Sequence, residues 1–252
     1  ISCNNCEYCL KGENSMCYNY KVLGHHINGG YSEYIVVPSN IVFKIPNDKS
    51  FEEASSIPLV FITAYRAIFT KAKPNINETV FVWSAGSGVG MASIQLLKLI
   101  NCTVISTVGS DEKVEKAYKL GCDYVINYKK QDVLKEVKEF TKGKGVDIVI
   151  EHIGKDTLDT SVKMLKKGGK IVTFGATSGY LVSLDIRYFY SRQLSLIGSY
   201  IGSIYEFIKV IDLYKNGKIK AVIDSIYSIK DVKEAHKRME SKEHFGKIIL
   251  RI

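Results

Sequence analysis

The chain has 252 residues, of which 46% are hydrophobic and 24% charged, and its formal net charge at pH 7 is +9. This composition excludes an intrinsically disordered chain, and no apolar run approaches the roughly 20 residues that a membrane-spanning helix needs. The lysines are spread over the polar faces of predicted helices, as at Lys113, Lys116 and Lys119, so the charge does not favour a nucleic-acid groove. The first residues show no targeting signal, so we expect a cytoplasmic protein without nucleic-acid or membrane partners. Abundant Ile, Lys, Glu and Tyr with few Gln is the composition associated with thermophiles.

Four of the six cysteines lie near the start of the chain, at Cys3, Cys6, Cys9 and Cys17. Closely spaced thiolates in a polar loop can converge on a zinc ion at about 2.3 Å. Disulfides and free thiols are the alternatives, and a cytoplasmic chain disfavours disulfides. Because four thiolates complete a tetrahedral shell, the pattern predicts a structural zinc and not a catalytic one. Cys102 and Cys122 border apolar strand segments and are expected to be small core side chains.

Residues 18–45 are expected to form irregular strands and turns, followed by a helix over 52–71 that can break near Pro58. A regular alternation of strand and helix then begins. Strands are predicted at 79–83, 103–108, 124–126, 146–150, 169–174 and 194–199, and helices at 88–99, 111–120, 132–140 and 157–165. Apolar strands alternating with amphipathic helices predict a parallel sheet covered on both faces, the doubly wound α/β architecture. The chain closes with helices predicted at 203–214 and 230–239 and strands near 225–227 and 247–250.

A glycine-rich turn, Ala85-Gly86-Ser87-Gly88-Val89-Gly90, lies between the first predicted strand of this series and its helix. Glycines in this context let the backbone approach a pyrophosphate held at the helix N-terminus. A plain tight turn is the alternative, and the strand–helix series that follows disfavours it. We therefore interpret the turn as part of a dinucleotide site.

The tip of the next strand, Thr107-Val108-Gly109-Ser110, lacks the acidic residue that usually binds the ribose 2′-hydroxyl of NAD. Lys113 follows within one turn of the predicted helix, for which Ser110 is the expected N-cap. A neutral tip with a nearby cation favours a 2′-phosphate and therefore NADPH over NADH. In the alternative, Asp111 or Glu112 reaches the ribose and Lys113 faces solvent.

These motifs resemble the medium-chain dehydrogenase/reductase superfamily, which contains zinc alcohol dehydrogenases and quinone oxidoreductases. The segments 29–34, 63–67 and 245–250 also carry the resemblance, which covers the whole chain. It implies a catalytic domain, the remainder of a β-rich GroES-like fold with a structural zinc lobe, formed by residues 1–61 and 202–252. A dinucleotide-binding Rossmann domain is implied at 62–201. Because the chain starts at the cysteines, the family's front segment, with half the substrate pocket, is expected to be missing.

The resemblance also implies roles for residues that would hold the cofactor. Thr63 and Val89 would pack against the nicotinamide, and Ile153 and Gly175 would flank its ribose and carboxamide. Lys113 and Tyr128 match the pair that holds the 2′-phosphate in the quinone-reductase branch. The pyrophosphate and the adjacent ribose would lie against the remaining residues of the set, which are Ser87, Gly88, Gly90, Ser110 and, from the other domain, Lys247.

One departure from the family bears on the chemistry. Members with a catalytic zinc carry a Cys four residues before the Thr of Thr63-Ala64-Tyr65, and this chain has Leu59 there. His25 and His26 do not match a ligand position, so a catalytic zinc is not expected. No catalytic residue is assigned. Tyr31 and Tyr65 are candidates for a general acid only because of their residue type. Because the chain has 16 tyrosines, a structural role is the better interpretation for each of them.

The leading hypothesis is an oxidoreductase that passes hydride from NADPH to a quinone, an activated alkene or a carbonyl on a small-molecule substrate. The first alternative is a zinc-type alcohol dehydrogenase acting on small alcohols and aldehydes, with NAD(H). The second is a nucleotide-binding remnant without turnover. The family resemblance further implies a homodimer or homotetramer joined through the strand at 194–199, whose apolar residues would otherwise leave an exposed sheet edge.

Overall fold

The structure is a computed structural model that describes residues 1–252. The chain forms two compact units, a smaller one of Ile1–Ile62 with Ile201–Ile252 and a larger one of Thr63–Tyr200. Each boundary falls one residue from the domain boundary expected from the sequence. None of the helices combines the length and apolar character needed to cross a bilayer.

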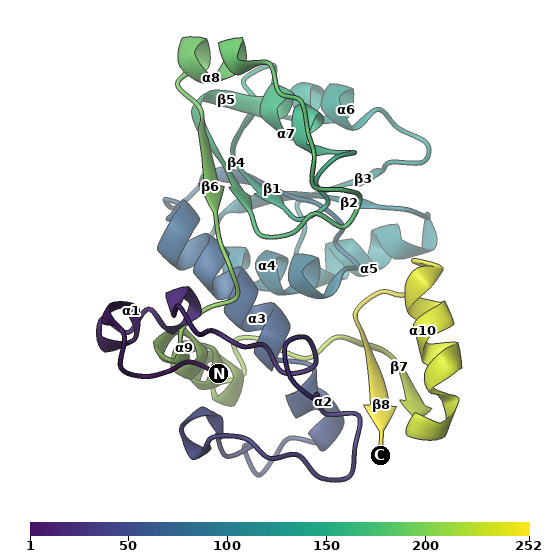
Figure 1. The fold of residues 1–252 in the computed structure, drawn as a ribbon. Helices are drawn as coiled ribbons and strands as arrows, with labels where there is room; N and C mark the ends of the chain where they lie inside the picture. Colours follow the sequence, from purple (N-terminus) through teal and green to yellow (C-terminus); the bar gives the residue numbers. More distant parts are fainter. The chain divides into compact units, whose positions relative to one another are not determined.

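The larger unit is built on a six-stranded parallel sheet (Figure 1). Its strands are β1 Thr79–Val82, β2 Thr103–Val108, β3 Tyr124–Asn127, β4 Val146–Glu151, β5 Leu165–Thr173 and β6 Ser195–Gly198. Their order is β3-β2-β1-β4-β5-β6, so the winding direction reverses between β1 and β4. This confirms the doubly wound fold and places a switch point, where such sheets bind ligands, at the carboxyl ends of β1 and β4.

Helices cover both faces of this sheet, with α6 and α7 on one face and α4 and α5 on the other (Figure 1). The helices of the larger unit are α4 Gly88–Lys98, α5 Glu112–Leu120, α6 Val133–Phe140, α7 Leu158–Met164 and α8 Ile186–Arg192. Val137 of α6 and Val162 of α7 pack with Phe81, Ile105 and Ile126 of the strands in one buried cluster. Cys102 and Cys122 are buried, as predicted.

Two local details of the larger unit differ from the sequence predictions. Helix α8 was not predicted, although its Tyr188 and Phe189 pack against the core cluster. The N-cap of α5 is Asp111, so the prediction of Ser110 was wrong. The Asp111 side chain does not cap the helix, because it accepts hydrogen bonds from Asn127 at the end of β3 and from Lys130 beyond that strand.

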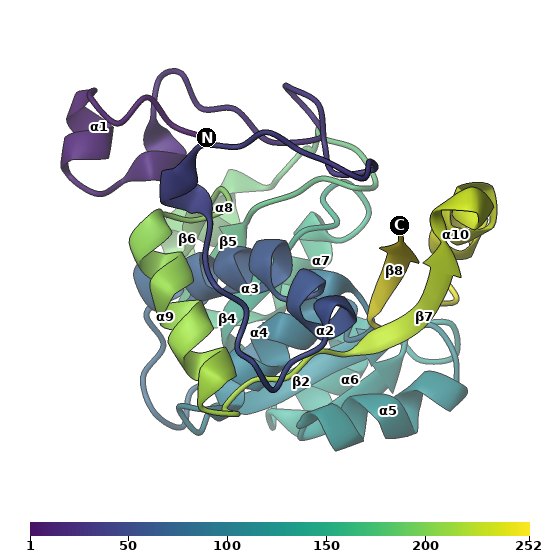
Figure 2. The same ribbon diagram turned by 90° about the horizontal axis from the view of Figure 1, so that it is seen from below.

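The smaller unit contains mostly short helices and one two-stranded parallel sheet, β7 Ile223–Ser228 with β8 Lys247–Arg251. Helix α10 Val232–Glu240 lies beside both strands (Figure 2). The other helical segments of this unit are α1 Glu7–Leu10, η1 Asn14–Met16, η2 Ser39–Ile41, α2 Phe51–Ser55, α9 Ile204–Lys215 and η4 Ile229–Asp231.

The helix predicted over 52–71 is interrupted as expected at Pro58, which begins α3 Pro58–Tyr65 and is followed by the π-helical η3 Arg66–Ala72. Residues 18–45, in contrast, contain turns, η2 and a single bridge between Leu23 and Ile27, but no strand. A strand persists only where a partner satisfies its backbone groups. Ile1 and Lys21 exchange backbone hydrogen bonds, but no longer ladder forms along these residues, and Val36 is 97% exposed.

Candidate functional site

The four predicted metal ligands converge in residues 1–17, which we call the cysteine lobe. Helix α1 carries Cys9 and has Cys6 as its N-cap, while Cys17 ends η1 and its Sγ accepts a hydrogen bond from the Cys3 amide. The four Sγ atoms lie within 4.8 Å of one another, and the Cys3–Cys9 and Cys6–Cys9 sulfurs are 3.9 and 3.6 Å apart. Sulfurs around a tetrahedral zinc lie about 3.8 Å apart, since each Zn–S bond is about 2.3 Å.

The lobe therefore fits a zinc ion with four thiolate ligands. The Cys9 backbone amide lowers the pKa of Cys6 to about 6, whereas burial raises the pKa of Cys9 to about 11. Hydrogen bonds between the sulfurs add to both shifts, lowering the pKa of Cys6 and raising that of Cys9. No disulfide joins these cysteines.

The glycine-rich turn closes tightly between β1 and α4. A Cβ on Gly90 would lie 2.0 Å from the Ser84 carbonyl oxygen, so this position tolerates only glycine. Ser87 is the N-cap of α4, and its Oγ accepts a hydrogen bond from the Gly90 amide at 3.0 Å. Thr107 of β2 accepts from the Ser84 amide and anchors the turn to the neighbouring strand. The turn thus places the N-terminus of α4, with Gly88 and Val89 partly exposed, at the switch point.

The tip of β2 lies directly beside Tyr128. The Tyr128 amide donates to the Val108 carbonyl, and a Cβ on Gly109 would meet the Tyr128 hydroxyl at 2.7 Å. Lys113 lies in the first turn of α5, and its amide donates to the Ser110 carbonyl. The structure thus gathers Ser110, Lys113 and Tyr128 at one tip.

Asp111 at the same tip is engaged by β3. Its Oδ1 accepts from Asn127 Nδ2 at 2.7 Å, and Lys130 pairs with its other oxygen. The hydrogen bond from Lys130 is the main cause that lowers the pKa of Asp111. The Asp111 carboxylate is therefore charged, and its two oxygens accept from Asn127 and Lys130 and not from a ribose hydroxyl.

The loops that follow β4 and β5 are bonded to each other. The Ile153 carbonyl accepts from both the amide and the hydroxyl of Ser178, each at 2.8 Å, and the Lys155 amide donates to the Gly179 carbonyl. Gly154 has φ +92°, and a Cβ there would lie 2.6 Å from the Gly179 oxygen. Ile153 is therefore fixed beside the segment that contains Gly175, as the two predicted roles require.

Two further predicted residues, Thr63 and Lys247, belong to different units. Thr63 is buried on α3. Lys247 begins β8 in the smaller unit, where burial lowers its pKa. Leu59 on α3 is exposed, and His25 and His26 lie edge to face with each other in a loop.

Tyr31 packs edge to face with His236, and Tyr65 lies 4.7 Å from Phe69 between ring centroids. Both contacts are of the structural kind expected for these tyrosines. The structure adds one polar side chain that sequence reasoning missed at the switch point, the buried Glu151 at the end of β4. Its only sequence signal was an acidic residue directly after the apolar run 148–150.

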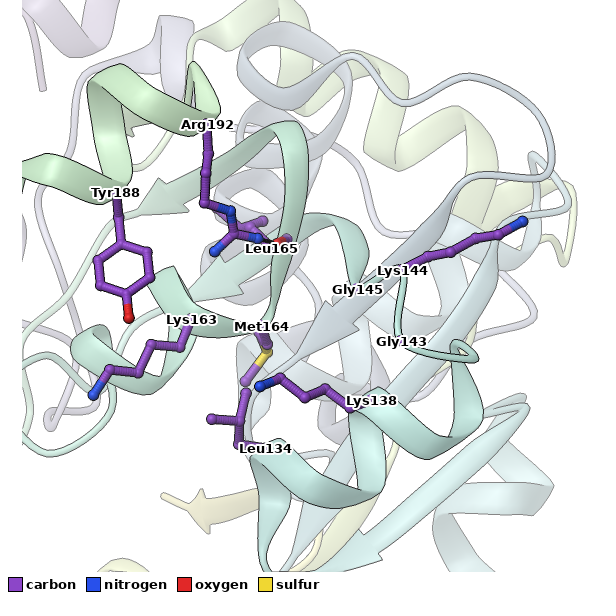
Figure 3. Close-up of a pocket in the computed structure, with 10 residues that line it drawn as sticks. All are labelled: Leu134, Lys138, Gly143, Lys144, Gly145, Lys163, Met164, Leu165, Tyr188 and Arg192. Carbon is purple, nitrogen blue, oxygen red and sulfur yellow. Dashed lines mark hydrogen bonds between the residues drawn. The ribbon is translucent and has the colours of Figure 1, made fainter.

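A separate cavity of about 280 Å³ lies at the amino ends of β4 and β5, the edge opposite the switch point (Figure 3). Four cationic side chains line it, but they do not converge. Lys144 extends away from the other lining residues, Lys163 pairs with Asp159, and Arg192 donates to the Leu165 carbonyl. We assign no ligand to this cavity.

Comparisons with known proteins agree with this geometry. Residues 88–216 match the family model described as zinc-binding dehydrogenase, and residues 1–47 match the alcohol dehydrogenase GroES-like domain. An NAD-dependent alcohol dehydrogenase of Sulfolobus acidocaldarius is 33% identical over 255 residues, which cover 100% of this chain and 73% of the relative. A probable quinone oxidoreductase of Schizosaccharomyces pombe is 32% identical, over 88% of this chain and 69% of the relative. The crystal structure of an NAD-dependent alcohol dehydrogenase superposes with a TM-score of 0.95 at 38% identity, covering 100% of this chain and 74% of that one.

Proposed function

The chain belongs to the medium-chain dehydrogenase/reductase superfamily, and we propose that this oxidoreductase transfers hydride between a nicotinamide cofactor and a carbonyl, quinone or activated alkene. One observation carries the proposal. The glycine turn after β1 and the mutually bonded loops after β4 and β5 lie at the same edge of a doubly wound sheet, at its switch point. NAD(P)H bound there supplies the hydride, while the residues of this chain bind and orient it.

In this proposal the N-terminus of α4 and the Gly88 backbone hold the pyrophosphate. Ile153, Gly175, Val89 and Thr63 surround the nicotinamide and its ribose. The larger unit is then the coenzyme domain and the smaller unit the catalytic domain. The cysteine lobe holds one structural zinc, for which the sulfur spacing is suitable.

We assign NADPH as the preferred cofactor. The tip of β2 offers Lys113 and Tyr128 to a 2′-phosphate, and Asp111 is held by Asn127 and Lys130. The proposal gives no role to a second zinc at position 59, because Leu59 cannot ligate a metal. The electrophile is then activated by positioning and by hydrogen-bond donors.

An NAD-dependent alcohol dehydrogenase is the second candidate. It is favoured by the name of the Sulfolobus relative, which is similar along the whole of this chain. The two candidates differ in metal content and in cofactor preference.

Elemental analysis of the purified chain, with NADPH and NADH titrated into the same sample, separates the candidates. We expect one zinc per chain and tighter binding of NADPH. Two zincs with tighter NADH binding would replace the first candidate by the second. One zinc without binding of either nucleotide would leave a remnant that has no cofactor function.

The exposed edge of the larger sheet supports a further part of the proposal, a homodimer or homotetramer. Strand β6 is an edge strand, and Leu196 on it is 44% exposed. Pairing of two β6 strands would satisfy both edges. Light scattering gives the mass in solution, and a monomer at all concentrations would contradict this assembly.

A further inference from the structure

Glu151 is a fully buried carboxylate at the last position of β4, where the strand meets the loop of the switch point. Buried carboxylates are rare in apolar cores and persist when several donors satisfy their oxygens. Nothing in the proposed function uses this side chain. Its hydrogen bonds, however, run to both sides of the switch point.

One oxygen of Glu151 organises the loop after β4. Its Oε1 accepts from the Ile153 amide at 2.8 Å, from the Gly154 amide at 3.2 Å and from the Thr157 hydroxyl at 2.9 Å. Three donors from five consecutive residues, 153–157, thus point at a single atom. This bonding fixes the Ile153 backbone from one side, while Ser178 holds its carbonyl from the other.

The other oxygen of Glu151 connects to the end of β1. Ser161 on α7 donates its hydroxyl to Oε2 at 2.6 Å and accepts from Trp83 Nε1 at 2.8 Å. Trp83 directly follows β1 and lies two residues before the glycine-rich turn. A single carboxylate therefore ties the ends of the two strands between which the sheet reverses its winding.

We propose that Glu151 is a positioning residue that sets where the nicotinamide half of the cofactor lies, through the Ile153 and Gly154 amides. This inference rests on the proposed function, since it assumes that a nicotinamide nucleotide occupies the switch point. The adenosine half lies against the β2 tip, which Glu151 does not contact. Loss of the carboxylate therefore weakens binding of the nicotinamide half selectively.

The test compares the affinity for NADPH with that for 2′,5′-ADP, which lacks the nicotinamide, in one chain at a time. In Glu151→Ala the ratio of the two affinities is expected to fall about tenfold, because charge-assisted hydrogen bonds to the loop are lost. Glu151→Gln keeps one carbonyl oxygen for the loop amides and should recover most of the ratio. The shift in emission of bound NADPH provides a second readout of the nicotinamide environment.

Two control variants separate positioning from general destabilisation. Asp147→Ala removes another acceptor of β4, which binds the Thr79 amide at the opposite end of the strand, and should lower stability without changing the ratio. Ser161→Ala removes the donor to Glu151 Oε2 and the acceptor of Trp83 Nε1 but keeps the three hydrogen bonds to Oε1, so it should leave the ratio near that of the unaltered chain.

Equal losses for NADPH and 2′,5′-ADP in Glu151→Ala, or no loss at all, would overturn the positioning role. If the unaltered chain binds neither nucleotide, the proposed function itself has failed. These two failures are distinguishable because the second appears before any variant is made.

Discussion

The cysteine lobe and the six-stranded sheet acquire their shapes by different means. In the lobe only Ser15 and Cys17 are buried, and its helical segments are four and three residues long. Strands β1 to β4 and helix α4 are buried along most of their length. A segment that short cannot offset its conformational entropy by apolar burial alone. The sheet unit therefore has a core to stabilise it, whereas we propose that a bound metal stabilises the lobe.

Removal of a zinc ligand should have the largest effect. Cys9→Ser is expected to lose the metal and unfold the lobe, because structural zinc contributes about 10 kcal/mol or more to its site. Zinc content and amide hydrogen exchange measure the two consequences. Cys122→Ala, a core cysteine of the sheet unit, should keep its zinc. Normal protection of the lobe in Cys9→Ser would show that packing and not metal holds it.

A substitution in the glycine turn should affect the larger unit next most strongly. Gly90→Ala places a methyl group 2.0 Å from the Ser84 oxygen and should destabilise this unit by about 1–3 kcal/mol while abolishing nucleotide binding. Thermal unfolding and NADPH titration measure both effects. The matched control is Gly198→Ala on β6, where an added Cβ meets no atom within 4 Å. Equal behaviour of the two variants would contradict the tight turn.

Acid should destabilise the smaller unit through Asp224. Burial alone would raise the pKa of Asp224, but hydrogen bonds from Arg238, the Phe245 amide and Ser225 lower it from 3.8 to about 2. A depressed pKa stabilises the fold above the unfolded value, so the contribution is lost as the pH falls from about 4 to about 2. It amounts to about 2 kcal/mol.

Urea unfolding over this range of pH measures the acid effect. The unaltered chain should lose more stability than Asp224→Asn, which lacks the titrating group. Parallel pH profiles for the two chains would remove Asp224 as the cause.

Cofactor preference should change by a smaller amount. Lys113→Ala is expected to weaken NADPH binding about tenfold and leave NADH binding unchanged, because only NADPH carries the 2′-phosphate. The exposed Lys116 lies one turn further along α5, and Lys116→Ala serves as the matched control. A parallel loss for both nucleotides would indicate that Lys113 supports the fold and does not select the cofactor.

The smallest effect is expected on the surface of the larger unit. Lys119 and Glu115 form an exposed ion pair on α5 at 2.6 Å. Lys119→Ala should cost less than about 0.5 kcal/mol, since solvent screens such pairs. Urea unfolding measures this cost. A value above about 1 kcal/mol would show that surface charge contributes to the stability of the larger unit, which we attribute to its buried core.

The sequence by itself determined most of the sheet unit and the metal site. Alternation of apolar strands and amphipathic helices located every strand of the sheet, because burial on both faces requires continuous apolar segments such as Val80–Val82. The cysteine spacing predicted a cluster that the structure brings together, because ligands near in sequence need little chain to converge. The glycine turn was equally local. The carbonyl oxygen of Ser84, only six residues away, leaves no room for a side chain at Gly90.

Tertiary structure alone decided the features that depend on distant partners. Residues 18–45 were expected to include strands, but no other segment of this chain forms a ladder with them, and a single bridge joins Leu23 to Ile27. From the sequence, Asp111 could have been a ligand of the ribose. In the structure its carboxylate instead accepts hydrogen bonds from Asn127 and Lys130. The loop partners of Glu151 are local, but its link to Trp83 exists only because α7 brings Ser161 between the two side chains. Periodicity reports which face of an element is buried, whereas the partners of a polar side chain are set by contacts between segments far apart in the chain.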